Sequence, residues 1–107
     1  MASKVNNLIR GTTPTIKITF KTIDPSTITD AYLVLKQDCV ERVKADITEA
    51  TVSSDDISWT LTQRQSFQLS PHKNVDIYCD WKTETGLRGR SKLYSCIVED
   101  TGVDEVF

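Results

Sequence analysis

The sequence predicts an all-β protein: an immunoglobulin-like antiparallel β-sandwich of about six or seven strands with at most one short helical turn. The first observation is the alternation along residues 74–82, where one face is apolar and the other polar. The second is a turn containing Gly86, followed by a further run over residues 87–98. The third is the even spacing of turn-forming clusters between short apolar runs. The apolar face of residues 74–82 consists of Val75, Ile77, Cys79 and Trp81.

Length and composition set the limits of the prediction. A chain of 107 residues fits one domain. The charged fraction is 26% and the net charge is −2, which argues against a general binder of nucleic acid or anionic membranes. No apolar run has the length of a secretory signal or a membrane span, so we expect a protein that is made soluble and stays in the cytosol at first.

Three cysteines, Cys39, Cys79 and Cys96, form neither a CxxC motif nor a Cys/His metal pattern. We expect free thiols in the role of small apolar side chains, with no disulfide, metal or cofactor. No cysteine pair brackets Trp59 or Trp81 at the spacing of an immunoglobulin inter-sheet bridge.

The chain begins with a polar segment, residues 1–12, which we predict to be an extended arm. The first strand is expected over residues 13–21, with Pro14 at its start or on a sheet edge. Asp24-Pro25-Ser26-Thr27 has the composition of a turn. Residues 28–37 are apolar on both parities, which favours a strand that is covered on both faces or one that crosses between the sheets.

Asp38-Cys39 is predicted to turn the chain into a polar edge strand over residues 40–45. A short strand over residues 47–52 is weakly marked. Residues 57–61 alternate clearly and place Trp59 inward, as Trp81 is placed inward on its own strand.

Thr62 and Gln65 have the spacing of a capping box, so one helical turn is expected there. The predicted organisation is an arm over residues 1–12, a sandwich over residues 13–98 and an extended acidic tail over residues 99–107.

No enzyme site is predicted. The single histidine, His72, lies in a turn where a Ser-His-Asp triad has no supporting spacing. The adjacent acids at Asp55-Asp56 and in the tail are typical of solvated or capping groups, because a glycosidase pair must face across a cleft. Phosphate-loop and calcium-loop patterns are absent from the sequence.

The candidate contact residues are Arg88, Arg90 and Lys92, which alternate onto one face of the last strand. With Tyr78 and Tyr94 beside them they could grip a nucleic-acid backbone. The interpretation we favour is cross-strand or inter-subunit ion pairing, because acidic residues occupy the polar face of the preceding strand.

Keeping apolar residues on one face predicts a hairpin register for these two strands. The predicted pairs are Trp81–Leu87, Asp80–Arg88, Tyr78–Arg90 and Asp76–Lys92. Gly86 is then expected in a left-handed conformation beside a three-residue connection.

Four segments, residues 10–15, 28–37, 57–63 and 86–91, resemble a known family. It comprises small structural proteins of the tail, baseplate or neck in tailed bacteriophages and prophages of Gram-positive gut bacteria. More distantly, the chain is similar to the N-terminal β-sandwich of phage baseplate upper proteins. The resemblance covers most of the chain from about Arg10, although Asp38-Cys39 replaces the more usual Gly-containing turn.

The resemblance implies a non-enzymatic virion protein, assembled in the host bacterial cytoplasm through sandwich edges and extended termini. Its implied partners are copies of itself and other virion proteins, with no small-molecule substrate, membrane or nucleic acid. The alternative is a module that binds carbohydrate or a host surface, which would need exposed aromatic rings. The exposure of the tyrosines and tryptophans discriminates between these functions.

Overall fold

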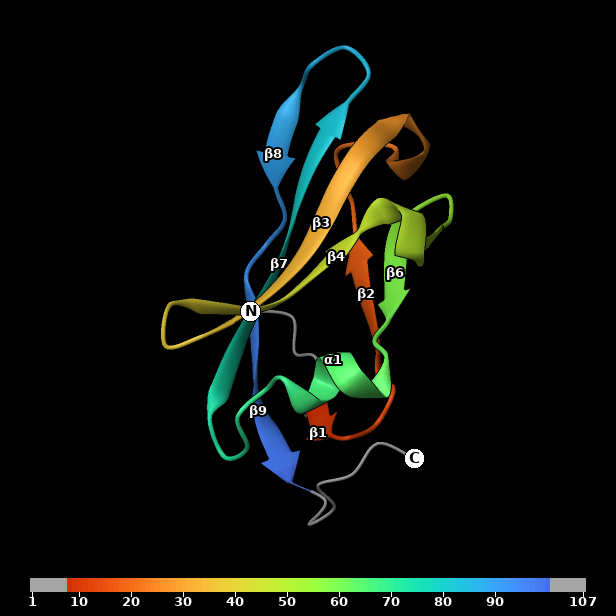
Figure 1. The fold of residues 1–107 in the computed structure, drawn as a ribbon. Helices are drawn as coiled ribbons and strands as arrows, with labels where there is room; N and C mark the ends of the chain where they lie inside the picture. The colour runs from red at the N-terminus through yellow and green to blue at the C-terminus, as the bar shows by residue number, and fades with distance from the viewer. Residues whose placement is uncertain (1–7, 101–107) are drawn as a thin grey trace.

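The computed structural model describes residues 8–100, which form two β-sheets packed face to face (Figure 1). The larger sheet has the strand order β1-β9-β7-β3-β4, and β8 also pairs with β7. The smaller sheet has the order β2-β6-β5. The strands are β1 (Leu8–Arg10), β2 (Thr15–Thr19), β3 (Ile28–Gln37), β4 (Val40–Asp46), β5 (Ala50–Val52), β6 (Asp56–Thr60), β7 (Asn74–Thr83), β8 (Arg88–Arg90) and β9 (Tyr94–Asp100).

The all-β sandwich is therefore confirmed, with more and shorter elements than predicted. Residues 8–100 contain nine strands because the last predicted strand is divided into β8 and β9, and because β1 is added, while β5 forms within the weakly marked segment 47–52. Three short helical segments replace the single predicted turn: 3-10 turns at Pro25–Thr27 and Ile47–Glu49, and α1 (Gln63–Phe67). None of the helices in this part of the chain is long and apolar enough to cross a bilayer.

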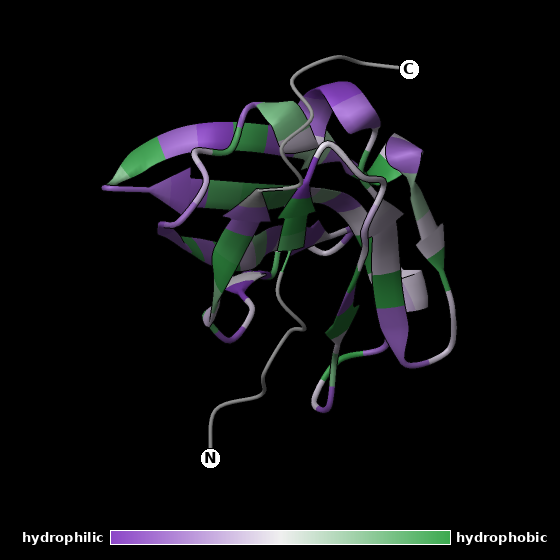
Figure 2. Cartoon of the chain, turned by 90° about the horizontal axis from the view of Figure 1, so that it is seen from below, coloured by the Kyte–Doolittle hydropathy of each residue, from purple (hydrophilic) through white to green (hydrophobic). Residues whose placement is uncertain are grey.

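The core lies between the two sheets and follows the period-two alternation of the strands (Figure 2). Ile16 and Ile18 of β2 and Ile57 of β6 face Leu33 and Ile77 of the larger sheet, and all five are fully buried. Trp59 is also a core residue, as predicted: its ring is 1% exposed, and its indole Nε1 donates to the Asp46 carbonyl at 2.9 Å.

β3 is an interior strand of the larger sheet and lies between β7 and the edge strand β4. Leu33 and Leu35 face the core, and Val34 on the opposite face is also buried, but Tyr32 on that outer face is 39% exposed. The prediction of a strand covered on both faces therefore holds only around Val34. β4 lies at one end of the sheet, which confirms the predicted edge strand.

The β3–β4 hairpin closes through Asp38 and Cys39, with φ angles of 51° and 63°. Two successive positive φ values between the paired residues Gln37 and Val40 are the geometry of a type I′ turn. Asp38 tolerates this region better than most residues, whereas Cys39 has no side-chain reason to adopt it. The Asp38 carboxylate also accepts a hydrogen bond from the Lys73 ammonium at 2.8 Å.

The predicted capping box is confirmed at the start of α1. The Thr62 hydroxyl accepts from the Gln65 amide at 3.1 Å, and the Gln65 side chain accepts from the Thr62 amide at 2.8 Å.

The N-terminal boundary differs from the prediction. Leu8–Arg10 is not an extended arm, because it forms β1, which pairs in parallel with β9 and buries Leu8. α1 holds the following turn: the Gly11 amide donates to the Ser66 hydroxyl at 3.0 Å, and Gln63 donates to the Gly11 carbonyl at 2.9 Å. The sequence offered only one apolar pair in this segment, so its pairing with a distant strand was not visible.

The C-terminal boundary shifts in the same way, because Glu99 and Asp100 belong to β9 and pair with Ile9 and Arg10. The remaining parts of the predicted arm and tail, residues 1–7 and 101–107, lie outside the described residues.

Candidate functional site

The β7–β8 hairpin carries the two predicted contact arginines, and its turn sets their position. Thr83 and Leu87 close the turn, with the Thr83 amide donating to the Leu87 carbonyl at 2.8 Å. Gly86 has a φ of +91°, in the left-handed region that was predicted for it. The three connecting residues are 84–86, so the glycine ends the turn and does not pair with Lys82.

The predicted register was wrong by two residues. The structure pairs Lys82 with Arg88, Trp81 with Gly89 and Asp80 with Arg90. The reason is steric: a Cβ on Gly89 would lie 2.3 Å from Cζ2 of Trp81, so the indole occupies the space above the residue without a side chain. The arginines keep the predicted face, because a shift of two residues preserves parity.

Trp81 is half-buried, and not a full core residue as predicted. Its ring packs edge-on against Phe20 with centroids 6.5 Å apart. Trp81 therefore closes this end of the sandwich and remains accessible from the β8 side.

Arg90 is held by Asp80 and Tyr78 on the outer face of the larger sheet. Its Nε and Nη2 donate to the two carboxylate oxygens of Asp80 at 2.6 and 3.1 Å, and its guanidinium lies 4.2 Å from the centroid of the Tyr78 ring. The hydrogen bonds to Asp80 raise the pKa of Arg90 above its ordinary value. The pairing of Asp80 and Arg90 confirms the interpretation of cross-strand ion pairing for this residue.

Arg88 differs from Arg90. Its cross-strand neighbour is Lys82, whose ammonium is paired with Asp30 at 3.4 Å. No hydrogen bond or ion pair of Arg88 is found among the described residues, and the residue is exposed. Arg88 is thus a cation available to a partner.

Lys92 does not lie with Arg88 and Arg90, although all three were predicted to share one face. Residues 91–93 separate β8 from β9 and interrupt their pairing with β7, because the Ser91 hydroxyl accepts from the Cys79 amide at 2.8 Å in place of a backbone carbonyl. Lys92 is exposed beyond this break and does not line the groove described next. The sequence reads as one continuous strand here, and no local signal marks the break.

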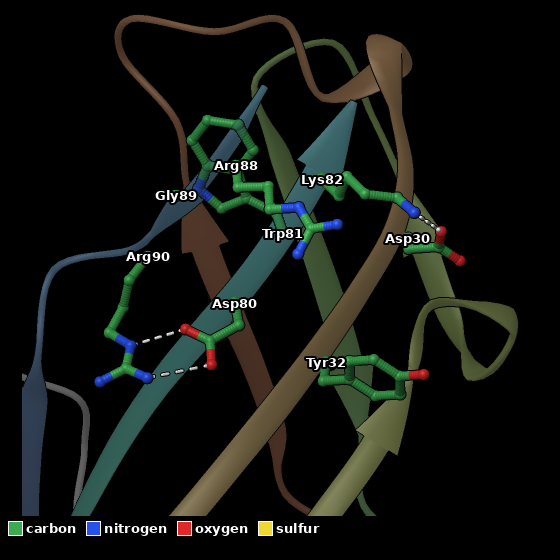
Figure 3. Close-up of a pocket in the computed structure, with 8 residues that line it drawn as sticks. All are labelled: Asp30, Tyr32, Asp80, Trp81, Lys82, Arg88, Gly89 and Arg90. Carbon is green, nitrogen blue, oxygen red and sulfur yellow. Dashed lines mark hydrogen bonds and ion pairs between the residues drawn. The ribbon is translucent and has the colours of Figure 1, made fainter. Parts of the chain in front are cut away.

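A groove of about 680 Å³ runs over the outer face of the hairpin and β3 (Figure 3). Its lining combines charged and aromatic side chains from three strands. They are Asp30, Tyr32, Asp80, Trp81, Lys82, Arg88, Gly89 and Arg90. We call this surface the hairpin groove.

β8, whose arginines line the hairpin groove, has an unpaired outer edge on the side away from β7. In the β7–β8 ladder, Thr83–Leu87 and Cys79–Ser91 are hydrogen-bonded pairs. Because bonded and non-bonded pairs alternate along an antiparallel ladder, the amide and carbonyl groups of Arg88 and Arg90 point away from β7. No backbone partner for them is found in residues 8–100.

Of the aromatic residues considered for a platform, Trp59, Tyr78 and Tyr94 are buried, and Tyr32 and Trp81 line the hairpin groove. Tyr78 and Tyr94 are 6% and 8% exposed, so the rings considered for ligand stacking are covered. Tyr32 is 39% exposed, and the Lys44 ammonium lies 4.4 Å from its ring centroid. A carbohydrate platform would therefore have to use Tyr32 and Trp81.

The residues that could carry out chemistry, the three cysteines and His72, are dispersed or buried. Cys39, Cys79 and Cys96 are free thiols, as predicted. Burial raises the pKa of Cys79 to about 12 and also raises the pKa of Cys96. His72 lies in an exposed turn with a φ of 64°. Within residues 8–100, no three metal-ligating side chains gather into a cluster.

Comparison with family models, with curated protein sequences and with solved structures gives no match for this chain. The family resemblance of the four sequence segments therefore stays a prediction, and the hairpin groove is the feature from which a function can be argued.

Proposed function

We propose that this chain is a non-enzymatic structural protein of a bacteriophage virion. It assembles with copies of itself and with other virion proteins into a ring or collar of the tail, baseplate or neck. The phage assignment rests on the sequence resemblance, and the assembly role rests on the edge of β8.

The observation that carries the assembly role is the combination of unpaired backbone groups and an unpaired cation at that edge. Monomeric sheet proteins cover, shorten or charge their edges, because an open edge recruits other chains. β8 is itself short and charged, so its pairing is restricted to strands of suitable charge. At β8 the charges disfavour pairing with a second β8 and favour a strand that carries carboxylates.

Two measurements test the two parts of the proposal. Sedimentation velocity over a range of protein concentrations tests assembly: we expect discrete oligomers that grow with concentration. A single species at the monomer mass of 12.1 kDa at every concentration contradicts the assembly role.

Mass spectrometry of purified tailed particles from an induced culture of the host strain tests the phage assignment. We expect peptides of this chain in the particles at a constant ratio to the major tail proteins. Peptides found only in the cell lysate contradict the assignment.

A further inference from the structure

We infer that the outer edge of β8, beside the hairpin groove of one copy, binds the acidic C-terminal segment, residues 101–107, of a second copy, so that the chain assembles head to tail. The inference rests on the proposed assembly role and names the partner of the β8 edge. Three features of the chain support it: the chemistry of the segment, its reach, and the geometry of the open edge.

The chemistry of the segment complements the groove. Residues 101–107 carry two carboxylates, Asp104 and Glu105, and no cationic side chain. The groove offers the unpaired guanidinium of Arg88, while its own acids, Asp30 and Asp80, are already paired with Lys82 and Arg90. An incoming carboxylate therefore meets a free cation, and a second basic strand would meet like charge.

The backbone geometry fits an added strand. The outward amides and carbonyls of Arg88 and Arg90 can bond an extended segment, as in β-augmentation. Asp104 and Glu105 are adjacent, so either register places one carboxylate beside the arginines. The same alternation turns at least one apolar side chain, from Val103, Val106 or Phe107, toward Trp81.

The segment is too short to reach the groove of its own chain. Arg88 is paired with Lys82 near the end of β7, and Ile97 is paired with Asn74 at its start. β8 and the end of β9 therefore lie at opposite ends of β7 (Figure 1). At ~3.4 Å per residue, Asp100 lies roughly 35 Å from Arg88 along the sheet. Seven extended residues span only about 24 Å. The segment can therefore reach only the groove of another molecule.

A groove at one end and its ligand at the other make a heterologous interface. Such an interface generates a ring when the rotation between neighbours closes, and a filament when it does not. This is the geometry that a ring or collar requires.

The test separates the two halves of the interface. One variant, Arg88→Glu, disables the groove. This exchange removes the like-charge pair with Lys82, so it is not expected to unfold the hairpin. The other variant, Asp104→Lys/Glu105→Lys, disables the segment. Arg42→Glu is the matched control, because Arg42 is an exposed arginine on β4, at the opposite edge of the sheet.

We expect each groove or segment variant alone to sediment as a monomer under conditions in which the native chain and Arg42→Glu assemble. Mixing the two variants should give a 1:1 dimer and nothing larger, because the mixture holds one working groove and one working segment. A synthetic peptide of residues 99–107 should bind the Arg42→Glu chain as tightly as the native chain, and the Arg88→Glu chain at least about tenfold more weakly.

Several results would overturn the inference. They are assembly of the segment variant at native strength, failure of the mixture to form the dimer, equal binding of the peptide to native and Arg88→Glu chains, or a native chain that remains monomeric. If assembly persists without the segment while the chain is found in phage particles, the inference fails and the proposed function stands. If the mixture forms the dimer but the chain is missing from particles, the phage assignment fails and the interface stands.

Discussion

The two halves of β7 differ in what covers them. Along its first half the strand pairs with β9, and Val75, Ile77 and Cys79 are fully buried beneath the smaller sheet. Along its second half it pairs with the short β8, and Asp80, Trp81 and Lys82 stay half-buried. One strand therefore belongs to the core at one end and to an open surface at the other.

The contrast indicates a division of roles along one element. The covered half contributes apolar burial, which is the main favourable term in folding. The open half contributes little burial and leaves backbone groups and Arg88 unpaired, so its bonds should open locally at low cost. The predictions below test this contrast, from the largest expected effect to the smallest.

Ile77→Ala tests the covered half. The side chain is fully buried, so its truncation should lower the free energy of unfolding by about 2–5 kcal/mol, measured by urea denaturation. Ile97→Ala on β9 is the matched control, because that isoleucine is 49% exposed and should cost less than about 1 kcal/mol. Equal losses for the two variants would show that the covered half is not what stabilises the fold.

Gly89→Ala tests the contact that closes the open half. The added Cβ would overlap the Trp81 indole, so the ring must move, at a cost of about 1–3 kcal/mol and with a shift in tryptophan fluorescence. Gly86→Ala isolates backbone strain, because nothing lies within 4 Å of its added Cβ while its φ is +91°. It should cost about 1 kcal/mol without changing the fluorescence. Unchanged stability and fluorescence in Gly89→Ala would contradict the packing.

The register at Gly89 shows what the sequence could not supply. Alternation along β7 and β6, the capping box at Thr62 and the left-handed Gly86 all follow from local chemistry, and each was predicted. The pairing of Trp81 with Gly89 depends on a steric fit across two strands, which alternation cannot encode. The pairing of Leu8–Arg10 with β9 depends on contacts about 90 residues apart in the chain.

The candidate site was also predicted only in part. Arg88 and Arg90 share one face because parity survives a shift of two residues. Lys92 was misplaced because the Ser91 side chain replaces a backbone carbonyl, and a serine in a polar run gives no sign of this. The unpaired state of Arg88 follows from its neighbours in space, and only the structure shows that the nearby acids are already paired.

The thiols report the same contrast through their reactivity. In the native protein at pH 8 we expect Cys39, which is exposed, to react with a disulfide reagent, while buried Cys79 and Cys96 react only after unfolding. Burial also raises the pKa of the Cys79 thiol, from 9.0 to about 12. The unfolded chain therefore loses the thiol proton at a lower pH than the folded chain does. Stability should therefore fall as the pH rises from about 9 toward 12. Three fast-reacting thiols in the folded chain would contradict the burial of the first half of β7.

Arg88→Ala should have the smallest effect on folding. Since Arg88 is exposed and has no partner within residues 8–100, its removal should change the free energy of unfolding by less than about 0.5 kcal/mol. The same variant should weaken assembly in sedimentation experiments. A large loss of stability would assign Arg88 to the fold and remove it from the interface.

Amide hydrogen exchange tests the central claim most directly, namely that a partner occupies the edge of β8. In dilute protein the amides of Arg88 and Arg90 should exchange fast, while those of Val75, Ile77 and Cys79 are protected. At concentrations where the chain assembles, the two arginine amides should become protected and the covered half should not change. Exchange at Arg88 and Arg90 that is equally fast in the monomer and in the assembly would contradict the account.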